Sequence, residues 1–148
     1  MKVSLKPVTK DNWIACIDLS LHPEQENNLA SNVETIAESK FEPDNILRAI
    51  YLGDRVVGML AYCVEDEPPD PEIYWIFRFM VDKDWQNRGY GKQALNLAIA
   101  EIAALGAKKI YTSHKSQNKI AGKLYQKLGF KYIGTLDDGD SSMEKIIR

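Results

Sequence analysis

Hydrophobic and polar positions follow two different periods along this chain. Alternation with a period of two is typical of half-buried strands, and apolar positions at i, i+3 and i+4 are typical of amphipathic helices. Two turn pairs, Gly53 with Asp54 and Asp138 with Gly139, separate strand-like runs and suit tight antiparallel hairpins. In order, the pattern predicts a strand, two helices, three strands, a helix, a strand, a helix and two strands. Strands connected through helices pair in parallel and hairpins pair antiparallel, so we expect a mixed sheet with helices packed on it.

The N-terminal helices are predicted from short apolar stripes. Thr9 offers an N-cap for the first helix. The apolar positions of this helix are Trp13, Ile14 and Ile17. In the segment 27–40 a second stripe recurs at helical spacing, and Pro43 is expected to end that helix. The positions of the second stripe are Leu29, Val33, Ile36 and Ala37.

The C-terminal half carries clearer helix signals. A long i, i+3, i+4 stripe predicts a helix that ends at Gly106. Its buried positions are expected to be Leu95, Ala98, Ile99, Ile102 and Leu105. A shorter helix is predicted between Asn118, which can cap it, and Gly129, which can end it. Upstream, the acidic, proline-rich segment 65–72 is predicted to be a loop before an apolar strand over 73–81, because proline removes a backbone donor and fixes its own φ.

Length and composition narrow the class of protein. With 148 residues the chain is long enough for one domain and too short for two separate cores, so residues 1–148 are predicted to form a single domain. The net charge of −2 gives no basic footprint for binding nucleic acid. No segment approaches the roughly 20 apolar residues of a membrane helix and the N-terminus lacks a signal peptide, so a cytoplasmic protein without membrane contact is expected. Cys16, Cys63, His22 and His114 stand apart in the sequence, so neither a disulfide nor a metal site is expected.

The segment 84–95, "DWQNRGYGKQAL", places two glycines and several basic or polar residues between an apolar strand and a helix. A Walker-type phosphate loop requires GxxxxGK[ST], but Gln86 stands in place of the first glycine and Gln93 in place of the hydroxyl residue. "GYGKQA" satisfies the dinucleotide-binding pattern GxGxxA. Its glycines, however, come several residues after the strand, and the next strand ends without an acidic residue for a ribose. Neither nucleotide motif is therefore supported.

The remaining interpretation is a pyrophosphate cradle made by backbone N–H groups at a helix N-terminus. Gly89 and Gly91 permit positive φ and close approach of a phosphate. Arg88 and Lys92 add cations of long reach. On these residues alone, a plain strand-to-helix turn with solvated basic side chains stays open as the alternative.

Two motifs resemble those of one protein family. "QNRGYG", residues 86–91, resembles the Q/R-x-x-G-x-G/A acetyl-coenzyme A motif of the GNAT superfamily of N-acetyltransferases, and "NKIAGKLYQKLGF", residues 118–130, resembles the second signature of that family. The predicted order of elements is also similar to the family over essentially the whole chain. The resemblance implies an α/β (α+β) GNAT fold. Its mixed central sheet would have about seven strands, flanked by about four helices, with the fourth and fifth strands splayed apart.

The resemblance also implies that acetyl-CoA is the co-substrate, with its pantetheine arm inserted between the splayed strands like a missing strand. Backbone groups of Phe79 and Val81 would face that arm. The residues implied to hold the pyrophosphate are Gln86, Asn87, Arg88, Gly89, Tyr90, Gly91 and Lys92. Asn118 matches the family's asparagine near the coenzyme arm, although as a bare residue it is equally well explained as a helix cap. No metal is implied.

Acetyl transfer to an amine sets three chemical requirements. An alkyl amine with a pKa of about 10 is almost wholly protonated at pH 7, so a proton must be accepted. The developing oxyanion must be stabilised, for which a backbone N–H of the fourth strand is suited, and the departing thiolate needs a proton. The resemblance assigns this last role to Tyr125, for which the alternative is a core tyrosine on the buried stripe of its helix.

No general base is evident in the sequence. Glu72 and Tyr74 begin the strand that leads into the site, and Glu72 could relay a proton through water or be an ordinary solvated side chain. With Glu24, these are the candidate substrate-binding residues. Cys63 is not expected to carry the acetyl group, because direct transfer needs no thiol and no activating histidine is near it in the sequence.

The segment 8–32 resembles the polyamine and diamine branch of the superfamily, the bacterial spermine/spermidine acetyltransferases. Glu24 and its acidic neighbours, with the segment 65–72, could form an acidic mouth for a polycation, or could be solvated surface charges. Phe77 departs from this branch, whose members often carry an acidic residue there. A small-molecule amine is therefore expected as acceptor, with a polyamine or diamine as first choice. The alternatives are an aminoglycoside, an amino acid, a protein N-terminus, or a non-catalytic acyl-CoA-binding module. Members of the superfamily often pair through their last strands, so a homodimer also stays open.

Overall fold

A computed structural model of the chain describes residues 1–28 and 31–147. Its elements follow the predicted order, with two short 3₁₀ helices, η1 and η2, in addition. They are β1 (Val3–Pro7), α1 (Trp13–Ile17), η1 (Pro23–Asn28), α2 (Asn32–Ser39), β2 (Ile46–Leu52), β3 (Arg55–Asp66), β4 (Pro69–Val81), η2 (Lys83–Trp85), α3 (Tyr90–Ala104), β5 (Lys109–His114), α4 (Lys119–Lys127), β6 (Lys131–Thr135) and β7 (Ser141–Ile146). Both predicted hairpins are confirmed, and the glycine in each turn, Gly53 or Gly139, has a positive φ.

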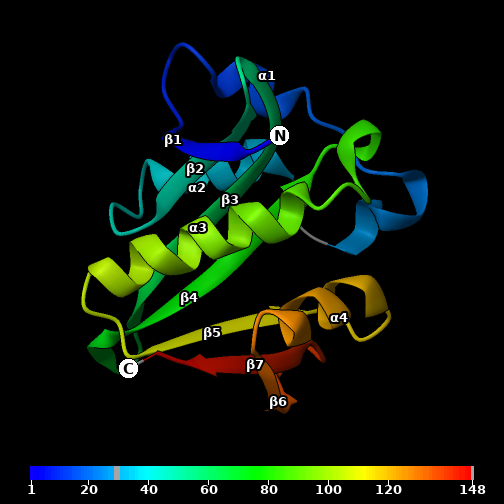
Figure 1. The fold of residues 1–148 in the computed structure, drawn as a ribbon. Helices are drawn as coiled ribbons and strands as arrows, with labels where there is room; N and C mark the ends of the chain where they lie inside the picture. The colour runs from blue at the N-terminus through cyan, green and yellow to red at the C-terminus, as the bar shows by residue number, and fades with distance from the viewer. Residues whose placement is uncertain (29–30, 148) are drawn as a thin grey trace.

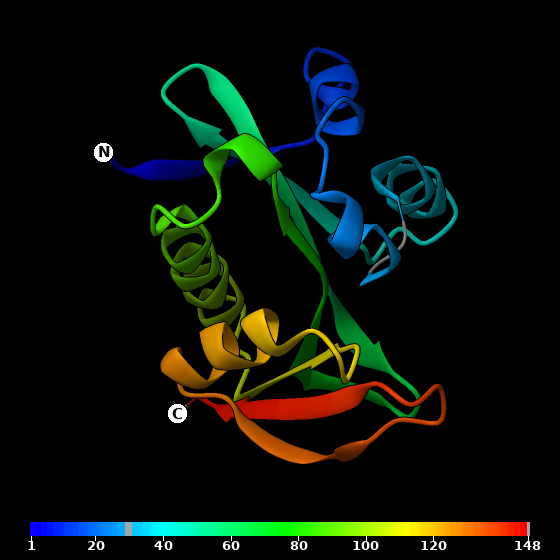
Figure 2. The same ribbon diagram turned by 90° about the vertical axis from the view of Figure 1, so that its right-hand side faces the viewer.

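The seven strands form one mixed sheet in the order β1-β2-β3-β4-β5-β7-β6 (Figure 1). Neighbouring strands are antiparallel except for β4 and β5, which are parallel and are connected through α3. Figure 2 shows α1 and α2 on one side of the sheet and α3 and α4 on the other. The sheet therefore has the predicted mixed pairing and is covered by helices on both sides.

The sheet opens between β4 and β5, as the family resemblance implied. Residues 73–76 of β4 pair with residues 109–112 of β5, but β4 continues to Val81 without this partner. In the β3–β4 pair, Ala61 is opposite Arg78 and Tyr62 is opposite Ile76, so Phe77 is an extra residue in β4. Such a bulge bends its strand. The bulge therefore lies where the two parallel strands begin to diverge.

The main hydrophobic core lies between the sheet and the helices α3 and α4. Three residues of the predicted α3 stripe are fully buried, namely Leu95, Ala98 and Ile102. Ile99 is half-buried at the edge of the stripe. The prediction for Leu105 is wrong: this side chain is 52% exposed, because α3 ends before it and Gly106 at φ 98 turns the chain. No helix in the described residues is long and apolar enough to cross a membrane.

The predicted loop over 65–72 is wrong. β3 runs to Asp66 and β4 begins at Pro69, and these two residues pair across a tight turn. The ladder then shifts register before Tyr74, and Pro71 lies within that shift. Proline is tolerated as the first residue of a strand, where Pro69 lies, and at an irregular position, where Pro71 removes no required ladder hydrogen bond.

The N-terminal helices also differ from their predictions. Asn12, not Thr9, precedes α1, and its side chain accepts a hydrogen bond from the Thr9 N–H at 2.8 Å. Trp13 and Ile14 are exposed, so the short helix buries only Cys16 rather than an apolar stripe.

In α2 the residue that becomes fully buried is polar, while Ile36 is half-buried against the sheet. Thr35 is buried and its hydroxyl accepts a hydrogen bond from Arg78 Nε at 2.9 Å, whereas Val33 is 55% exposed. The helix is capped by Ser31 and ends at Ser39, before the predicted stop at Pro43. The predicted stripe position Leu29 lies outside the described residues.

Candidate active site

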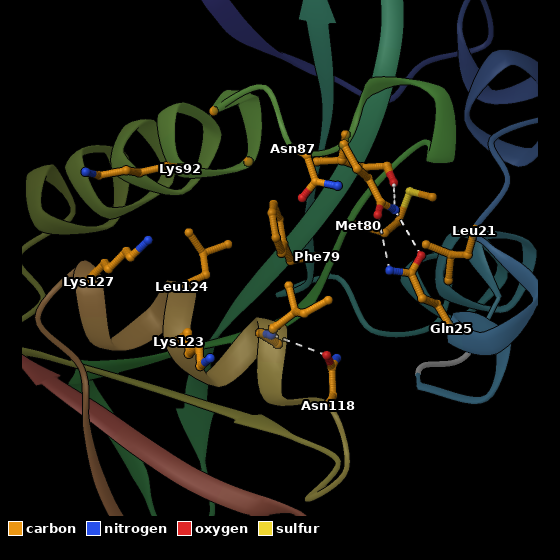
Figure 3. Close-up of a pocket in the computed structure, with 16 residues that line it drawn as sticks. Leu21, Gln25, Phe79, Met80, Asn87, Lys92, Asn118, Lys123, Leu124 and Lys127 are labelled. Atoms are coloured by element: carbon orange, nitrogen blue, oxygen red, sulfur yellow. Dashed lines mark hydrogen bonds between the residues drawn. The ribbon is translucent and has the colours of Figure 1, made fainter.

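A cavity of about 480 Å³ lies where β4 leaves β5, between α3 and α4 (Figure 3). Most of the residues that the sequence assigned to coenzyme binding line it, namely Phe79, Val81, Gln86, Asn87, Gly89, Gly91, Lys92 and Asn118. The remaining lining residues are Leu21, Gln25, Met80, Ile120, Ala121, Lys123, Leu124 and Lys127. The fold therefore brings the two sequence motifs, far apart along the chain, to opposite walls of one pocket.

The loop before α3 is shaped for an anion. Asn87 has φ 62 and Gly89 has φ 84, both in the left-handed region that most side chains avoid. Gly89 is the N-cap of α3, so the N–H groups of the first turn have no side-chain cap, and that turn holds no acidic residue. Uncapped N–H groups and the positive end of the helix dipole favour a bound phosphate. The loop is therefore suited to an anionic group, and its binding of the pyrophosphate stays a prediction.

Gly91 lies where the pocket wall leaves little room for a side chain. A Cβ atom at this position would lie 3.0 Å from Phe79 Cζ and within 4 Å of Val81 and Leu124 side chains. All four residues line the pocket. The absent Cβ therefore allows the first turn of α3 to lie close to Phe79 on the wall of the pocket.

Three lysines surround the pocket, Lys92 from α3 and Lys123 and Lys127 from α4 (Figure 3). None of the described lining residues is acidic, so the pocket favours an anionic ligand. The α4 lysines were not predicted from the sequence. Their spacing of four residues, which places both on one helix face, is the signal that could have found them.

Removing the α4 lysines is expected to weaken coenzyme binding without slowing the chemical step. Lys123→Ala and Lys127→Ala should each raise the KM for acetyl-CoA about fivefold, because each removes one accessible positive charge from the pocket lining. The effect should shrink at high ionic strength, which screens exposed charges. Steady-state kinetics at two salt concentrations measures both trends. The matched control is Lys119→Ala, on the same helix but outside the pocket lining. If Lys119→Ala raised the KM for acetyl-CoA equally, the increase would reflect the overall surface charge and not the pocket.

Arg88 and Tyr90 do not line the pocket. The Arg88 guanidinium lies 5.1 Å from the ring centre of Trp85, and the Tyr90 ring lies 6.4 Å from the same indole. Trp85 thus packs against both residues beside the loop. These two side chains therefore lie beside the loop, near Trp85, and do not contact the cavity.

Tyr125 is buried, with its side chain 5% exposed, and its ring packs edge-on against Phe130. It is not one of the pocket-lining residues, although its helical neighbours Ala121 and Leu124 are. Burial raises the pKa of the Tyr125 phenol, and the adjacent Thr112 hydroxyl partly offsets this. A phenol with a raised pKa stays protonated at neutral pH, the form that a proton donor requires.

The three candidate substrate-binding residues are not brought together. Glu24 is exposed on η1, next to the pocket-lining Gln25. Glu72 lies at the other end of β4 from the pocket, where it is exposed and paired with Lys108 at 3.0 Å. Tyr74 faces the core and packs against Tyr62. None of the three lines the pocket, and Glu24 is adjacent in sequence to the lining residue Gln25.

Neither cysteine resembles a nucleophile. Burial raises the pKa of the Cys16 thiol to about 11. The pKa of Cys63 is also raised to about 11, mainly by burial and further by the carboxylates of Asp66 and Glu65. Both thiols therefore stay protonated at neutral pH, whereas a nucleophilic cysteine needs a thiolate.

The opposite face of β4 and β5 carries aromatic and acidic side chains. Ile76 faces the core, so strand alternation directs Trp75 and Tyr111 to the other face, where their ring centres are 5.0 Å apart. Trp75 Nε1 donates a hydrogen bond to Glu65 Oε1 at 3.1 Å. The Lys109 ammonium lies 5.5 Å from the Tyr111 ring centre. Of these residues, only Glu65 was named from the sequence, as part of the acidic segment 65–72, although the alternation over 73–77 could have separated the two faces.

Comparisons with known proteins agree with this geometry. The sequence model described as "Acetyltransferase (GNAT) family" matches residues 11–130. The chain is 33% identical to a probable spermine N(1)-acetyltransferase of Bacillus subtilis subsp. natto, over 98% of this chain and 99% of that protein. It is 32% identical, with the same coverage, to the spermine/spermidine N(1)-acetyltransferase of Bacillus subtilis (strain 168). A crystal structure of aminoglycoside acetyltransferase AAC(6')-Ib with coenzyme A and kanamycin has a TM-score of 0.82 at 17% identity, covering 98% of this chain and 95% of that one.

The structural likeness at 17% identity supports the fold alone. The family match covers more than half of the chain, and the two Bacillus proteins align over nearly its whole length. The pocket, with its glycine-rich anion cradle at the opening between β4 and β5, is in keeping with that match. The chain belongs to the GNAT family of acetyltransferases and is an acetyl-CoA-dependent N-acetyltransferase.

Proposed function

We propose that this enzyme transfers the acetyl group of acetyl-CoA to a primary amine of a polyamine, with spermine and spermidine as the first candidates. The observation that carries the choice of acceptor is the similarity, over nearly the whole chain, to the two Bacillus proteins named for spermine or spermidine acetylation. The acidic and aromatic face of β4 and β5 supports it, because a polycation is attracted by carboxylates and by aromatic ring faces.

The coenzyme end of the reaction follows from the pocket. The N–H groups of residues 89–91 and the surrounding lysines would hold the diphosphate. The arm would then lie along Phe79 and Val81, on the part of β4 that β5 leaves unpaired. This position brings the thioester to the bulge at Phe77, where the strands diverge.

In the chemical step, the acceptor amine and the thioester would meet from opposite faces of the sheet. The neutral amine nitrogen attacks the thioester carbonyl, and the proton lost from nitrogen passes to solvent. A backbone N–H of β4 near the bulge would stabilise the oxyanion of the tetrahedral intermediate. When the carbon–sulfur bond breaks, the Tyr125 phenol would donate its proton to the thiolate. Reprotonation of the phenolate from water completes the cycle.

The acceptor would lie on the face opposite α3 and α4. Trp75 offers a ring face to an ammonium group, and Glu65, fixed by its hydrogen bond to Trp75, offers a carboxylate, whereas the Tyr111 ring already has the Lys109 ammonium beside it. Glu38 on α2 adds negative charge near Cys63, the register partner of Trp75. A linear polyamine has several ammonium groups at intervals, so one chain can contact several of these side chains while its terminal amine reaches the bulge.

A panel of amines tests the acceptor. The purified enzyme is assayed by release of free thiol from acetyl-CoA with spermine, spermidine, kanamycin, lysine and a short peptide. We expect kcat/KM for the two polyamines to exceed the others by at least about 100-fold, because a site built for spaced charges leaves its groups unpaired with other amines. A preference for kanamycin or the peptide would replace the polyamine by that acceptor. Coenzyme binding without turnover of any amine would instead indicate a non-catalytic acyl-CoA-binding protein.

A further inference from the structure

The short helix η1 is joined to the coenzyme loop by a pair of carboxamides (Figure 3). Gln25 Nε2 donates to Gln86 Oε1 at 3.1 Å, and Gln86 Nε2 donates to Gln25 Oε1 at 3.0 Å. Both side chains line the pocket, although they are 61 residues apart in the sequence. The first residue of the coenzyme motif is thus bonded to the segment that resembles the polyamine branch.

The Gln86 carboxamide has no free donor left for a phosphate. An amide nitrogen carries two hydrogens. One is donated to Gln25, and the other is donated to the carbonyl oxygen of Val81 at 2.9 Å. Exchanging the amide nitrogen and oxygen would place two oxygens against each other at Val81, so this orientation is the consistent one. The side chain of Gln86 therefore acts through its neighbours and does not itself bind the coenzyme phosphates.

A second contact fixes the same segment to the end of β4. The N–H of Ser20 donates to Asp82 Oδ1 at 2.8 Å, and the N–H of Lys83 donates to the Ser20 carbonyl at 2.7 Å. Within the segment, Gln25 is oriented by His22, whose N–H donates to Gln25 Oε1 at 3.2 Å. The chain between these two attachments, which includes Leu21, forms part of the pocket wall.

We propose that the Gln25–Gln86 pair is a positioning contact that couples coenzyme binding to acceptor binding, an inference that rests on the proposed function. A bound diphosphate requires the left-handed loop beginning at Asn87, and that loop geometry presents Gln86 to Gln25. The pair in turn holds η1 at the pocket, and η1 precedes α2, the helix that carries the proposed acceptor-side residue Glu38. Binding of the coenzyme thereby favours the conformation that binds the acceptor. By thermodynamic linkage, binding of the acceptor favours the conformation that binds the coenzyme to the same degree.

A double-mutant cycle tests the coupling. Gln25→Ala and Gln86→Ala should each raise the Kd for coenzyme A, measured by calorimetry, about fivefold, because each breaks the same pair of hydrogen bonds. The double variant should be no weaker than the weaker single variant. Gln86→Ala should also raise the KM for spermidine at saturating acetyl-CoA about threefold. A residue that only supported the coenzyme loop would leave that KM unchanged.

The controls separate this inference from the proposed function. Gln126→Ala, an exposed glutamine on α4 outside the pocket lining, should leave both constants unchanged. Thermal melts of the variants without ligand establish that each is folded. Additive effects of the two substitutions on the Kd, or an unchanged KM for spermidine in Gln86→Ala, would overturn the coupling. Failure of the polyamine proposal would appear in the wild-type enzyme, as turnover of another amine, and the calorimetric cycle would still decide whether the pair acts as one unit.

Discussion

Replacing Tyr125 with phenylalanine is expected to lower kcat by at least about tenfold, the range usual for losing a general acid, while coenzyme binding is retained. The substitution removes only the hydroxyl from a buried ring, so the packing against Phe130 is preserved. Burial raises the pKa of this phenol, so it is protonated at neutral pH and can supply the proton that the departing thiolate needs. Thiol-release kinetics gives kcat, and calorimetry with coenzyme A gives the Kd.

Tyr51→Phe is the matched control for this experiment. Tyr51 lies on β2, outside the pocket lining, and its hydroxyl accepts a hydrogen bond from Asn12. Its kcat should equal that of the wild type. If Tyr125→Phe also retains full kcat, water rather than this phenol protonates the thiolate, and Tyr125 is only a core residue.

Gly91→Val is expected to raise the KM for acetyl-CoA by roughly thirtyfold, equivalent to about 2 kcal/mol of lost binding free energy. The new Cβ would lie 3.0 Å from Phe79 Cζ, and its two methyl groups would crowd the pocket-lining side chains of Phe79, Val81 and Leu124. The position is in the first turn of α3 and has no positive φ, so the helix itself accepts the substitution. Titration with coenzyme A by calorimetry measures the loss of binding. A melting curve without ligand measures any loss of stability separately.

Ala100→Val controls for the insertion of valine into α3. Ala100 is exposed on the same helix and lies outside the pocket, so its KM should stay at the wild-type value. A Gly91→Val variant that binds coenzyme A normally would place the coenzyme elsewhere than in this pocket. A variant that fails to melt cooperatively would be replaced by Gly91→Ala, for which a smaller rise in KM in the same direction is expected.

The parts of the site that were predicted correctly depend on local rules. A positive φ at Gly89 and a helix beginning directly after it follow from the paired glycines and the apolar stripe. Asn118 caps α4 as expected, because its side chain accepts the N–H of Ala121 at 3.3 Å. Each of these features involves residues no more than a few positions apart.

The wrong predictions share a dependence on distant partners. The segment 65–72 was predicted to be a loop from its prolines, yet most of it pairs as strand across a short turn because the bulged ladder needs no donor from Pro71. Leu105 matched the helical period but falls beyond the end of the helix. Thr35 was not in the apolar stripe, yet it is the residue that α2 buries, because Arg78 supplies a hydrogen-bond partner from β4.

The sequence by itself determined the order of the elements, the glycine-rich turn before α3 and the family, because hydrogen bonding and periodicity within a few residues suffice for these features. Tertiary structure alone decided which lysines line the pocket, which side chains lie on each face of β4, and that Gln25 meets Gln86 across 61 residues. Such contacts depend on how strands pair and where one strand bulges. No local pattern of residues specifies that pairing, because each side chain's partner lies on a distant segment.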